Sequence, residues 1–245
     1  MIRTLVRCAV SLALFATSSS AGPGVSLRWN NCLGDGGAIS RTFACDTNAG
    51  VNALVGSFEL GADLLGVAGV EIVIDLTSSS ATLPAWWEFN QPGTCRTTAL
   101  RMNAVISTSA LACEDWSNGA AAGLLVSNVI GLNGPNTARM FGGFSVQANS
   151  LADLSAGKEY FAFNATLSNI KTLGAGACTG CLVPVMIVLD AIRVVTPPPP
   201  LGQPSRDILL SGPANGVDSN FATWQGAVFV PTRSSTWSAL KSLYR

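Results

Sequence analysis

Seven cysteines and no histidine define the chemistry that is open to this 245-residue chain. Without an imidazole, the chain cannot build a Ser-His-Asp or Cys-His nucleophile, and it lacks the commonest zinc ligand. Catalysis would have to use carboxylates, lysine, tyrosine or cysteine, and these residues form no recognisable catalytic motif. The sequence therefore predicts a non-catalytic protein without a cofactor or a metal ion.

Cys178 and Cys181 have the C-x-x-C spacing found in redox enzymes and zinc sites. A redox cysteine of this type lies at a helix N-terminus, which lowers its pKa, whereas residues 182–187 have the pattern of a strand. A zinc site would need a second pair of ligands. We therefore expect a structural disulfide, with redox activity and metal binding as the alternatives.

Six cysteines follow the first 21 residues, and they allow fifteen pairings. Proximity in the sequence is the only guide, and it favours three local bridges: Cys32 with Cys45, Cys95 with Cys113, and Cys178 with Cys181. The first would close a glycine-rich loop and contribute on the order of 3 kcal/mol on the chain-entropy model.

The N-terminus has the pattern of an export signal. Arg3 and Arg7 precede an apolar stretch at residues 8–17, and small residues at 19–21 suit cleavage after Ala21. Export to an oxidising compartment would also explain the cysteines. We predict a secreted, periplasmic or cell-surface protein.

Trp86-Trp87 is the candidate ligand-binding position, with Glu88 and Asn90 nearby. Adjacent residues of a strand face opposite ways, so one indole should be exposed and able to stack on a sugar ring. The alternative is that a loop or the C-terminal segment covers both. Trp116 and Trp224 are expected in the core or under a lid.

Acidic residues in predicted loops are the remaining candidates for chemistry, and they are Asp35, Asp46, Glu88, Glu114 and Asp115. A pair of them could act as the acid and base of a glycoside hydrolase if their separation were suitable. Glu114-Asp115 could instead bind calcium, although no Asp-x-Asp-x-Asp-Gly loop is present. Asn164-Ala-Thr166 is a glycosylation sequon.

Alternation of apolar and polar residues organises the chain between residues 22 and 195. It is typical of antiparallel sheets with one face in the core. The apolar rows are Val25-Leu27-Trp29, Val70-Ile72-Ile74-Leu76, Leu100-Met102-Ala104-Ile106, Phe161-Phe163-Ala165-Leu167 and Val183-Val185-Ile187-Leu189. Further strands are expected near 51–60, 124–132 and 140–148, with a helical turn at 149–154. The sequence predicts an all-β, antiparallel β-sandwich or jelly roll.

Four parts follow from this pattern: a signal peptide at 1–21, a β-sandwich domain at 22–195, a proline-rich connector at 196–207, and a C-terminal part at 208–245. Four consecutive prolines make the connector stiff and extended. The C-terminal part has strand patterns at 208–210 and 222–230. Trp237, Leu240 and Tyr244 then form one stripe of a short amphipathic helix. We expect this helix to pack on the sandwich or, alternatively, to dock on a partner.

Charged residues make up only 11% of the chain and form no basic run. Nucleic acid is therefore excluded as a partner, since phosphate binding needs clustered Lys and Arg. No apolar run after residue 21 reaches the length of a membrane helix. The partner expected is an extracellular protein or a glycan, and the oligomeric state is open.

Residues 54–60, 67–76 and 154–164 resemble strands of cohesin-like β-sandwiches. Trp29-Asn-Asn-Cys32, Trp86-Trp87, Cys178-x-x-Cys181, Thr223-Trp-Gln-Gly226 and Lys241-Ser-Leu-Tyr-Arg245 also resemble exported bacterial proteins without a known activity. The first resemblance implies a jelly roll that binds rather than catalyses. The function expected is a secreted or cell-surface, disulfide-stabilised structural or binding module. The alternatives are a carbohydrate-binding module and a carboxylate-dependent glycoside hydrolase.

Overall fold

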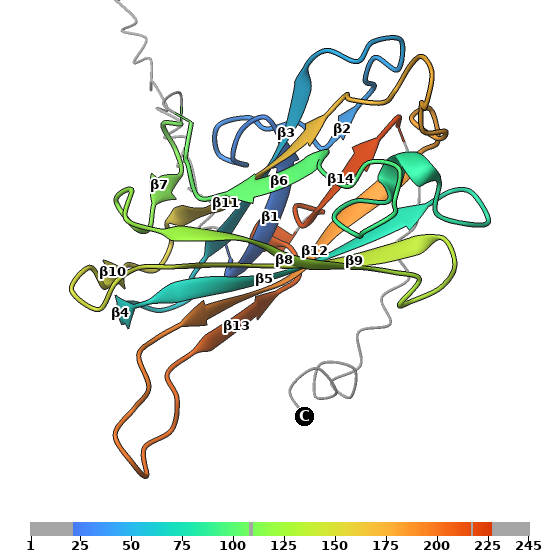
Figure 1. Ribbon diagram of the computed structural model, residues 1–245. Helices are drawn as coiled ribbons and strands as arrows, with labels where there is room; N and C mark the ends of the chain where they lie inside the picture. The colour runs from blue at the N-terminus through green and yellow to red at the C-terminus, as the bar shows by residue number, and fades with distance from the viewer. Residues whose placement is uncertain (1–21, 108–109, 217, 227–245) are drawn as a thin grey trace, which may run out of the picture.

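Two largely antiparallel sheets face each other across one hydrophobic core in this computed structural model, which describes residues 22–107, 110–216 and 218–226 (Figure 1). The five-stranded sheet has the order β1-β3-β11-β6, with β7 paired in parallel to β11. The seven-stranded sheet has the order β2-β14-β12-β5-β9-β8, with β13 paired to β12. A third, two-stranded sheet joins β10 to β4. The predicted all-β sandwich is confirmed.

The strands of the described residues are β1 Gly24–Trp29, β2 Ser40–Arg41, β3 Val51–Glu59, β4 Leu64–Val67, β5 Gly69–Ser78, β6 Leu100–Asn103, β7 Glu114–Asp115, β8 Ala122–Ile130, β9 Thr137–Ser145, β10 Ala152–Leu154, β11 Glu159–Ser168, β12 Val185–Val195, β13 Ile208–Ser211 and β14 Phe221–Trp224. The two short 3-10 helices are η1 Ala85–Trp87 and η2 Ala214–Gly216. A turn followed by β10 replaces the helical turn expected at 149–154.

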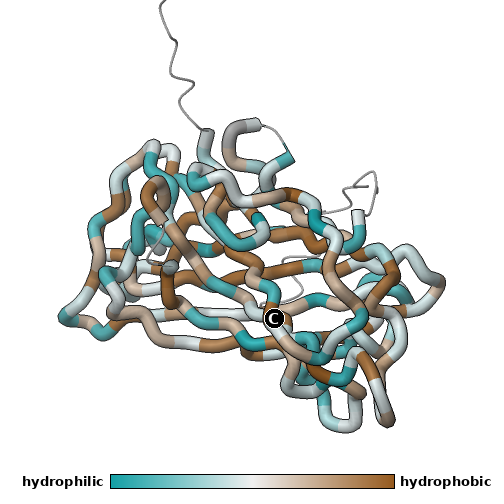
Figure 2. The backbone as a smooth tube through the Cα atoms, turned by 90° about the horizontal axis from the view of Figure 1, so that it is seen from above, coloured by the Kyte–Doolittle hydropathy of each residue, from teal (hydrophilic) through white to brown (hydrophobic). Residues whose placement is uncertain are grey.

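Strand β5 illustrates why these sequences form a sandwich. Val70, Ile72, Ile74 and Leu76 are each 1% exposed and lie in the core, while Glu71 on the other face is exposed. Burying one aliphatic row stabilises the sheet by about 2 kcal/mol per side chain. Apolar segments accordingly run along the strands, and hydrophilic residues concentrate at the periphery (Figure 2).

Strand β11 departs from simple alternation at a β-bulge. The register shifts between Phe161 and Phe163, so Phe163 joins the main core whereas Phe161 packs on the opposite face with Val55. The expectation that both rings face inward is wrong for Phe161. An inserted residue changes which face a side chain takes, and composition does not reveal it.

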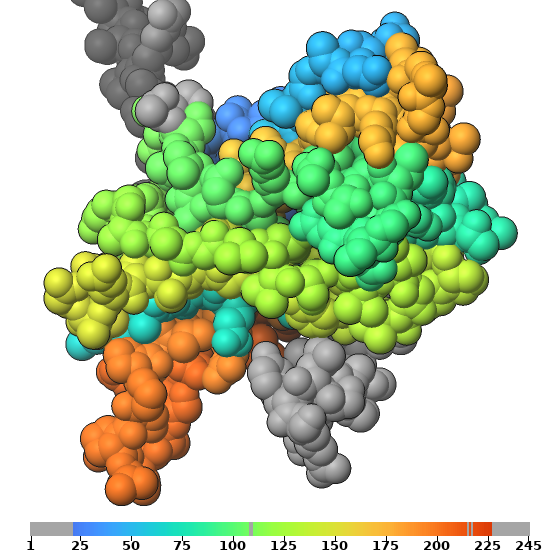
Figure 3. Space-filling view, in the orientation of Figure 1, coloured from blue at the N-terminus to red at the C-terminus, as the bar shows by residue number. Residues whose placement is uncertain are grey.

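Residues 196–207 form the connection from β12 to β13, and they project from the body of the molecule (Figures 1 and 3). Its two ends are held together, because Asp207 accepts hydrogen bonds from the backbone and hydroxyl of Thr196 and pairs with Arg193. Strands β13 and β14 both pair with β12 in the larger sheet. The predicted signal peptide and C-terminal helix lie outside the described residues.

Candidate functional site

Trp86 and Trp87 are both fully buried, so the prediction of one exposed indole is wrong. They lie in η1, where both rings turn into the core against Trp224, at centroid distances of 4.9 and 5.2 Å. Glu88 and Asn90 are partly buried, and the backbone N–H of Asn90 donates to Thr97. The period-two argument fails here because the segment is a 3-10 turn and not a strand.

A tryptophan cluster thus closes one part of the core, and it consists of Trp29, Phe43, Trp86, Trp87 and Trp224. Phe43 stacks on Trp224 at 4.0 Å, and the Trp224 indole N–H donates to the carbonyl of Cys181 at 2.7 Å. Trp116 is 2% exposed, so the core placement of Trp116 and Trp224 is confirmed. All five tryptophans of the described residues are buried.

The six cysteines form three disulfides, but none is a local pair. The bonds are Cys32–Cys113, Cys45–Cys181 and Cys95–Cys178, with sequence separations of 81, 136 and 83. The three predicted pairings are wrong, because strand pairing brings distant loops together. Since Cys178 and Cys181 bond to different partners, the C-x-x-C spacing here carries two structural bridges and no redox pair.

The acidic residues proposed for catalysis or calcium binding are engaged separately. Glu114 pairs with Lys158 at 2.8 Å. Asp115 accepts hydrogen bonds from Ser117 and Gly119 and holds the turn after β7. Asp46 is exposed and Glu88 is partly buried. Asp35, Glu114 and Asp115 therefore each have hydrogen-bonding or ionic partners of their own.

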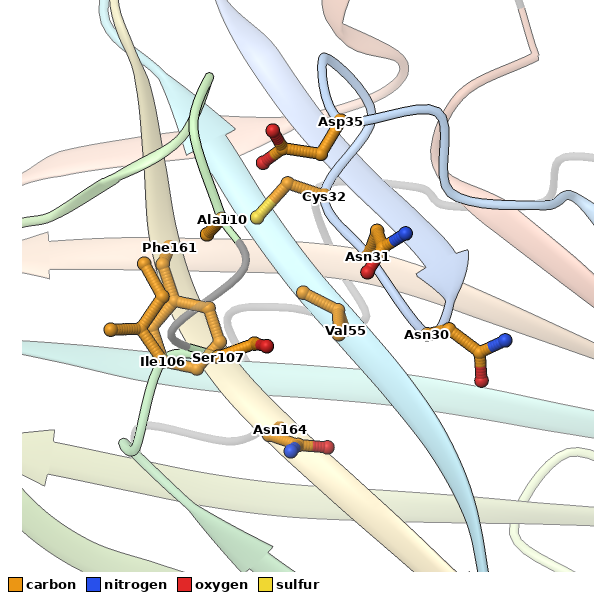
Figure 4. A pocket seen from close by; sticks show the side chains of 10 residues that line it. All are labelled: Asn30, Asn31, Cys32, Asp35, Val55, Ile106, Ser107, Ala110, Phe161 and Asn164. Atoms are coloured by element: carbon orange, nitrogen blue, oxygen red, sulfur yellow. The ribbon is translucent and has the colours of Figure 1, made fainter.

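The candidate site is a hollow on the outer face of the five-stranded sheet (Figure 4). Strands β3 and β11 supply its floor, and the loops after β1 and β6 form its sides. The lining residues are Asn30, Asn31, Cys32, Asp35, Val55, Ile106, Ser107, Ala110, Phe161 and Asn164. The cavity volume of the hollow is about 20 Å³, and the open space at its mouth brings the total to about 290 Å³. A cavity of this volume holds about one water-sized polar group, so the hollow admits the polar end of one side chain.

An unpartnered acceptor lies in this hollow. The Oδ1 atom of Asn164 is buried, and no donor of the described residues reaches it. An unmet buried acceptor costs about 1–3 kcal/mol. Asn164 is fixed in β11 between Val55 on β3 and Asn103 on β6. Its amide therefore faces the hollow with an unused bonding position.

An apolar cluster and a disulfide stiffen the hollow. Cys32, Val55, Cys113 and Phe161 form a small buried cluster on this face, and Ile106 packs against it. Since Cys32 and Cys113 are bonded to each other, they are not available as thiolate ligands beside Asp35. The chain offers no metal centre here.

Asp35 fastens the two sides of the hollow together. Its carboxylate accepts from the backbone N–H groups of Leu111 and Ala112, both at 2.8 Å, and from Cys113 at 3.4 Å. Partial desolvation acts to raise the pKa of Asp35, but these three hydrogen bonds outweigh it and hold the pKa below the usual value. The carboxylate is thus a structural clamp.

A polar network lies beside the hollow on the same face. Glu159 accepts from the hydroxyl of Ser57 and from the backbone N–H groups of Leu33 and Gly34, at 2.9 and 2.8 Å for the latter two. Glu59 on the neighbouring strand is only 4% exposed. A side chain at Gly34 would displace its neighbours, since a Cβ there would lie 2.8 Å from the Cβ of Ala112 and 2.9 Å from Oε2 of Glu159.

Sequence reasoning missed the hollow and this network. Asn30-Asn31 beside Cys32 and the sequon residue Asn164 were visible signals, but their convergence depends on the pairing of β1, β3 and β11. Glu59 lies between the apolar residues Phe58 and Leu60, and that interruption could have marked it.

No known family profile matches the chain, and no curated protein matches it. A solved structure that resembles it is the second type II cohesin module from the cellulosomal adaptor ScaA scaffoldin of Acetivibrio cellulolyticus. The likeness covers 71% of this chain and 85% of that module, with 8% identity and a TM-score of 0.31. A likeness at this score carries no argument about the family or the binding site of this chain.

Proposed function

We propose that the chain is a non-catalytic binding module of an oxidising, extracytoplasmic compartment, and that it captures a segment of a partner protein at the hollow. The observation that carries this proposal is the buried, unpartnered Oδ1 of Asn164. A partner side chain that ends in an N–H donor would satisfy it. Three buried disulfides suit that compartment.

The chemistry of the lining selects a donor with an aliphatic stem. Val55, Ile106 and Phe161 give the hollow an apolar wall, and no Lys or Arg lines it. An anionic group would gain no counter-charge there, whereas an amine, guanidinium or amide can donate to Asn164. The end of a Lys, Arg, Gln or Asn side chain has this combination.

The surroundings favour a protein over a glycan. Val105 and Leu111 are 72% and 93% exposed, and they are chain neighbours of the lining residues Ile106 and Ala110. Exposed aliphatic side chains beside a pocket are typical of protein contacts. Sugar rings stack on exposed aromatic side chains, and every tryptophan of the described residues is buried. In the same part of the chain there is no helix long and apolar enough to cross a membrane.

The test is an NMR titration of the ¹⁵N-labelled protein with three probes: n-butylammonium, propionamide and methyl α-D-glucopyranoside. We expect the two nitrogen donors to shift the side-chain amide signals of Asn30, Asn31 and Asn164. Asn164→Leu should abolish the shifts, whereas Asn149→Leu, at an exposed asparagine outside the hollow, should leave them unchanged. Shifts with the glucoside alone would favour the carbohydrate alternative, and no shift with any probe would overturn the proposal.

A phage-displayed library of random peptides gives the second readout. Selection on the wild-type protein, with counter-selection on Asn164→Leu, should enrich peptides with a Lys, Arg, Gln or Asn anchor. Enrichment that is equal on both proteins would show that the hollow is not the binding position.

A further inference from the structure

Two glutamates face each other across neighbouring strands beside the hollow. Glu59 of β3 and Glu159 of β11 are directly opposite in the antiparallel register. Opposed side chains of this kind have Cβ atoms about 4.5–5.5 Å apart. Glu59 is 4% exposed, and its Oε1 atom is buried without a donor. We call Glu59 and Glu159 the carboxyl pair.

The surrounding charges do not balance two carboxylates. Arg28 of β1 interacts with Glu159 and Asp218, and its guanidinium donates to the carbonyls of Leu27, Ser219 and Phe221. Lys158, which directly precedes β11, is exposed and bonded to Glu114 of β7. In the two nearby loops, Asp63 accepts from Ala156, and Asp35 accepts from residues 111–113. Among the described residues, Arg28 is therefore the cation that interacts with Glu159, and it is shared with Asp218.

We propose that the carboxyl pair holds a single proton on Glu59, and that loss of this proton to water loosens Leu33 and Gly34 and weakens capture at the hollow. This inference rests on the proposed function, because it concerns regulation of the same site. An ionised Glu59 would be a buried charge without a partner, and such a charge costs several kcal/mol. Movement of the strand ends or entry of water relieves that cost.

Glu159 transmits the change to the hollow. It is the acceptor for the backbone N–H groups of Leu33 and Gly34, which lie between the lining residues Cys32 and Asp35. A second negative charge opposite Glu159 repels it and disturbs these two hydrogen bonds. The Asp35 clamp and the Cys32–Cys113 bond keep the rest of the loop attached.

The direction in which the pKa of Glu59 is shifted agrees with the geometry of the carboxyl pair. Burial, and then the charge of Glu159, raise the pKa of Glu59 above its ordinary value of 4.5. A carboxyl group with a raised folded-state pKa stabilises the fold fully below the unfolded-state value, and this contribution is lost as the pH rises through the folded-state pKa. The loop should therefore be tighter in mild acid than at higher pH.

The experiment follows the backbone amides of Leu33 and Gly34 against pH, without a ligand, by NMR shift and hydrogen exchange. In the wild type we expect a transition above the ordinary glutamate range and, after correction for base catalysis, about tenfold faster exchange on its alkaline side. Glu59→Gln should remove the transition. Glu114→Gln, at the exposed carboxyl that pairs with Lys158, should retain it.

A measurement without substitution covers the case in which Glu59→Gln does not fold. The ¹³C shift of the Glu59 side-chain carboxyl in the wild type should report protonation with the same midpoint. A midpoint at or below 4.5, or amides that do not respond, would overturn the inference. If the amides titrate but n-butylammonium and propionamide bind at no pH, the proposed function fails while the proton site stands.

Discussion

The tryptophan cluster and the hollow differ in the kind of buried polar atom that each leaves without a partner. In the cluster, the indole N–H groups of Trp29, Trp86 and Trp224 have acceptors, and the buried Nε1 donor of Trp87 has none among the described residues. In the hollow and beside it, the unpartnered atoms are acceptors, Oδ1 of Asn164 and Oε1 of Glu59. The comparison teaches that the unmet Trp87 donor is enclosed by packed rings, whereas the unmet Asn164 acceptor faces a hollow that opens to solvent.

Both regions are cross-linked, but the bridges have different neighbours. Cys45–Cys181 and Cys95–Cys178 join the main core beside the aromatic rings, whereas Cys32–Cys113 packs with the floor of the hollow. Mutations in the cluster should therefore change stability alone. Mutation of Asn164 in the hollow should change binding with little effect on stability, whereas mutation of the Cys32–Cys113 bridge should change both.

The largest effect is expected from Trp224→Ala. Trp224 is fully buried and contacts four other rings of the cluster. The cavity and lost contacts should cost about 3–5 kcal/mol. For a domain of this size that lowers Tm by roughly 10 °C in a thermal melt. A shift below about 2 °C would show that the cluster is not the stable region we describe.

Removal of one disulfide should come next. Cys45→Ser with Cys181→Ser should cost about 2–4 kcal/mol without changing binding of the NMR probes. The matched double variant, Cys32→Ser with Cys113→Ser, should lower stability similarly and also weaken probe binding. If both double variants bind as the wild type does, the Cys32–Cys113 bridge is not part of the site.

Arg96→Lys should have a smaller but distinct cost. Arg96 is 1% exposed, lies 3.5 Å from the Trp86 ring, and donates to the carbonyls of Trp86, Ser168 and Ile170. Burial lowers the pKa of Arg96 to about 9. A lysine ammonium cannot replace the planar guanidinium in these hydrogen bonds. We therefore expect the free energy of unfolding, measured by chemical denaturation, to fall by about 2 kcal/mol. An unchanged midpoint of the denaturation curve would contradict this expected loss of stability.

Asn164→Leu should have the smallest effect on stability. The substitution removes an unmet acceptor, so the free energy of unfolding should change by less than about 1 kcal/mol. Probe binding should fall more than tenfold, a loss above about 1.4 kcal/mol. A strongly destabilised variant would place Asn164 among the structural residues and end the contrast between the two regions.

The sandwich was predictable because alternation in β5 and β12 is a local property of the chain. Trp86-Trp87 was misassigned because the choice between a strand and a 3-10 turn depends on the packing of Trp224, which lies far away in the sequence. Phe161 was misplaced by a bulge that only strand pairing defines. The disulfides and the carboxyl pair join residues 81 to 136 positions apart, and their pairing is a consequence of topology.

The connectivity of the cysteines also determines how the protein must mature. No cysteine is bonded to the next cysteine in the sequence. An oxidase that joined cysteines in the order in which they are exported would therefore form non-native disulfides first. The native disulfides would then have to form by thiol–disulfide exchange. Secretion without a disulfide isomerase should give species with non-native disulfides, visible as several bands on a non-reducing gel. Addition of the isomerase should reduce these to a single band.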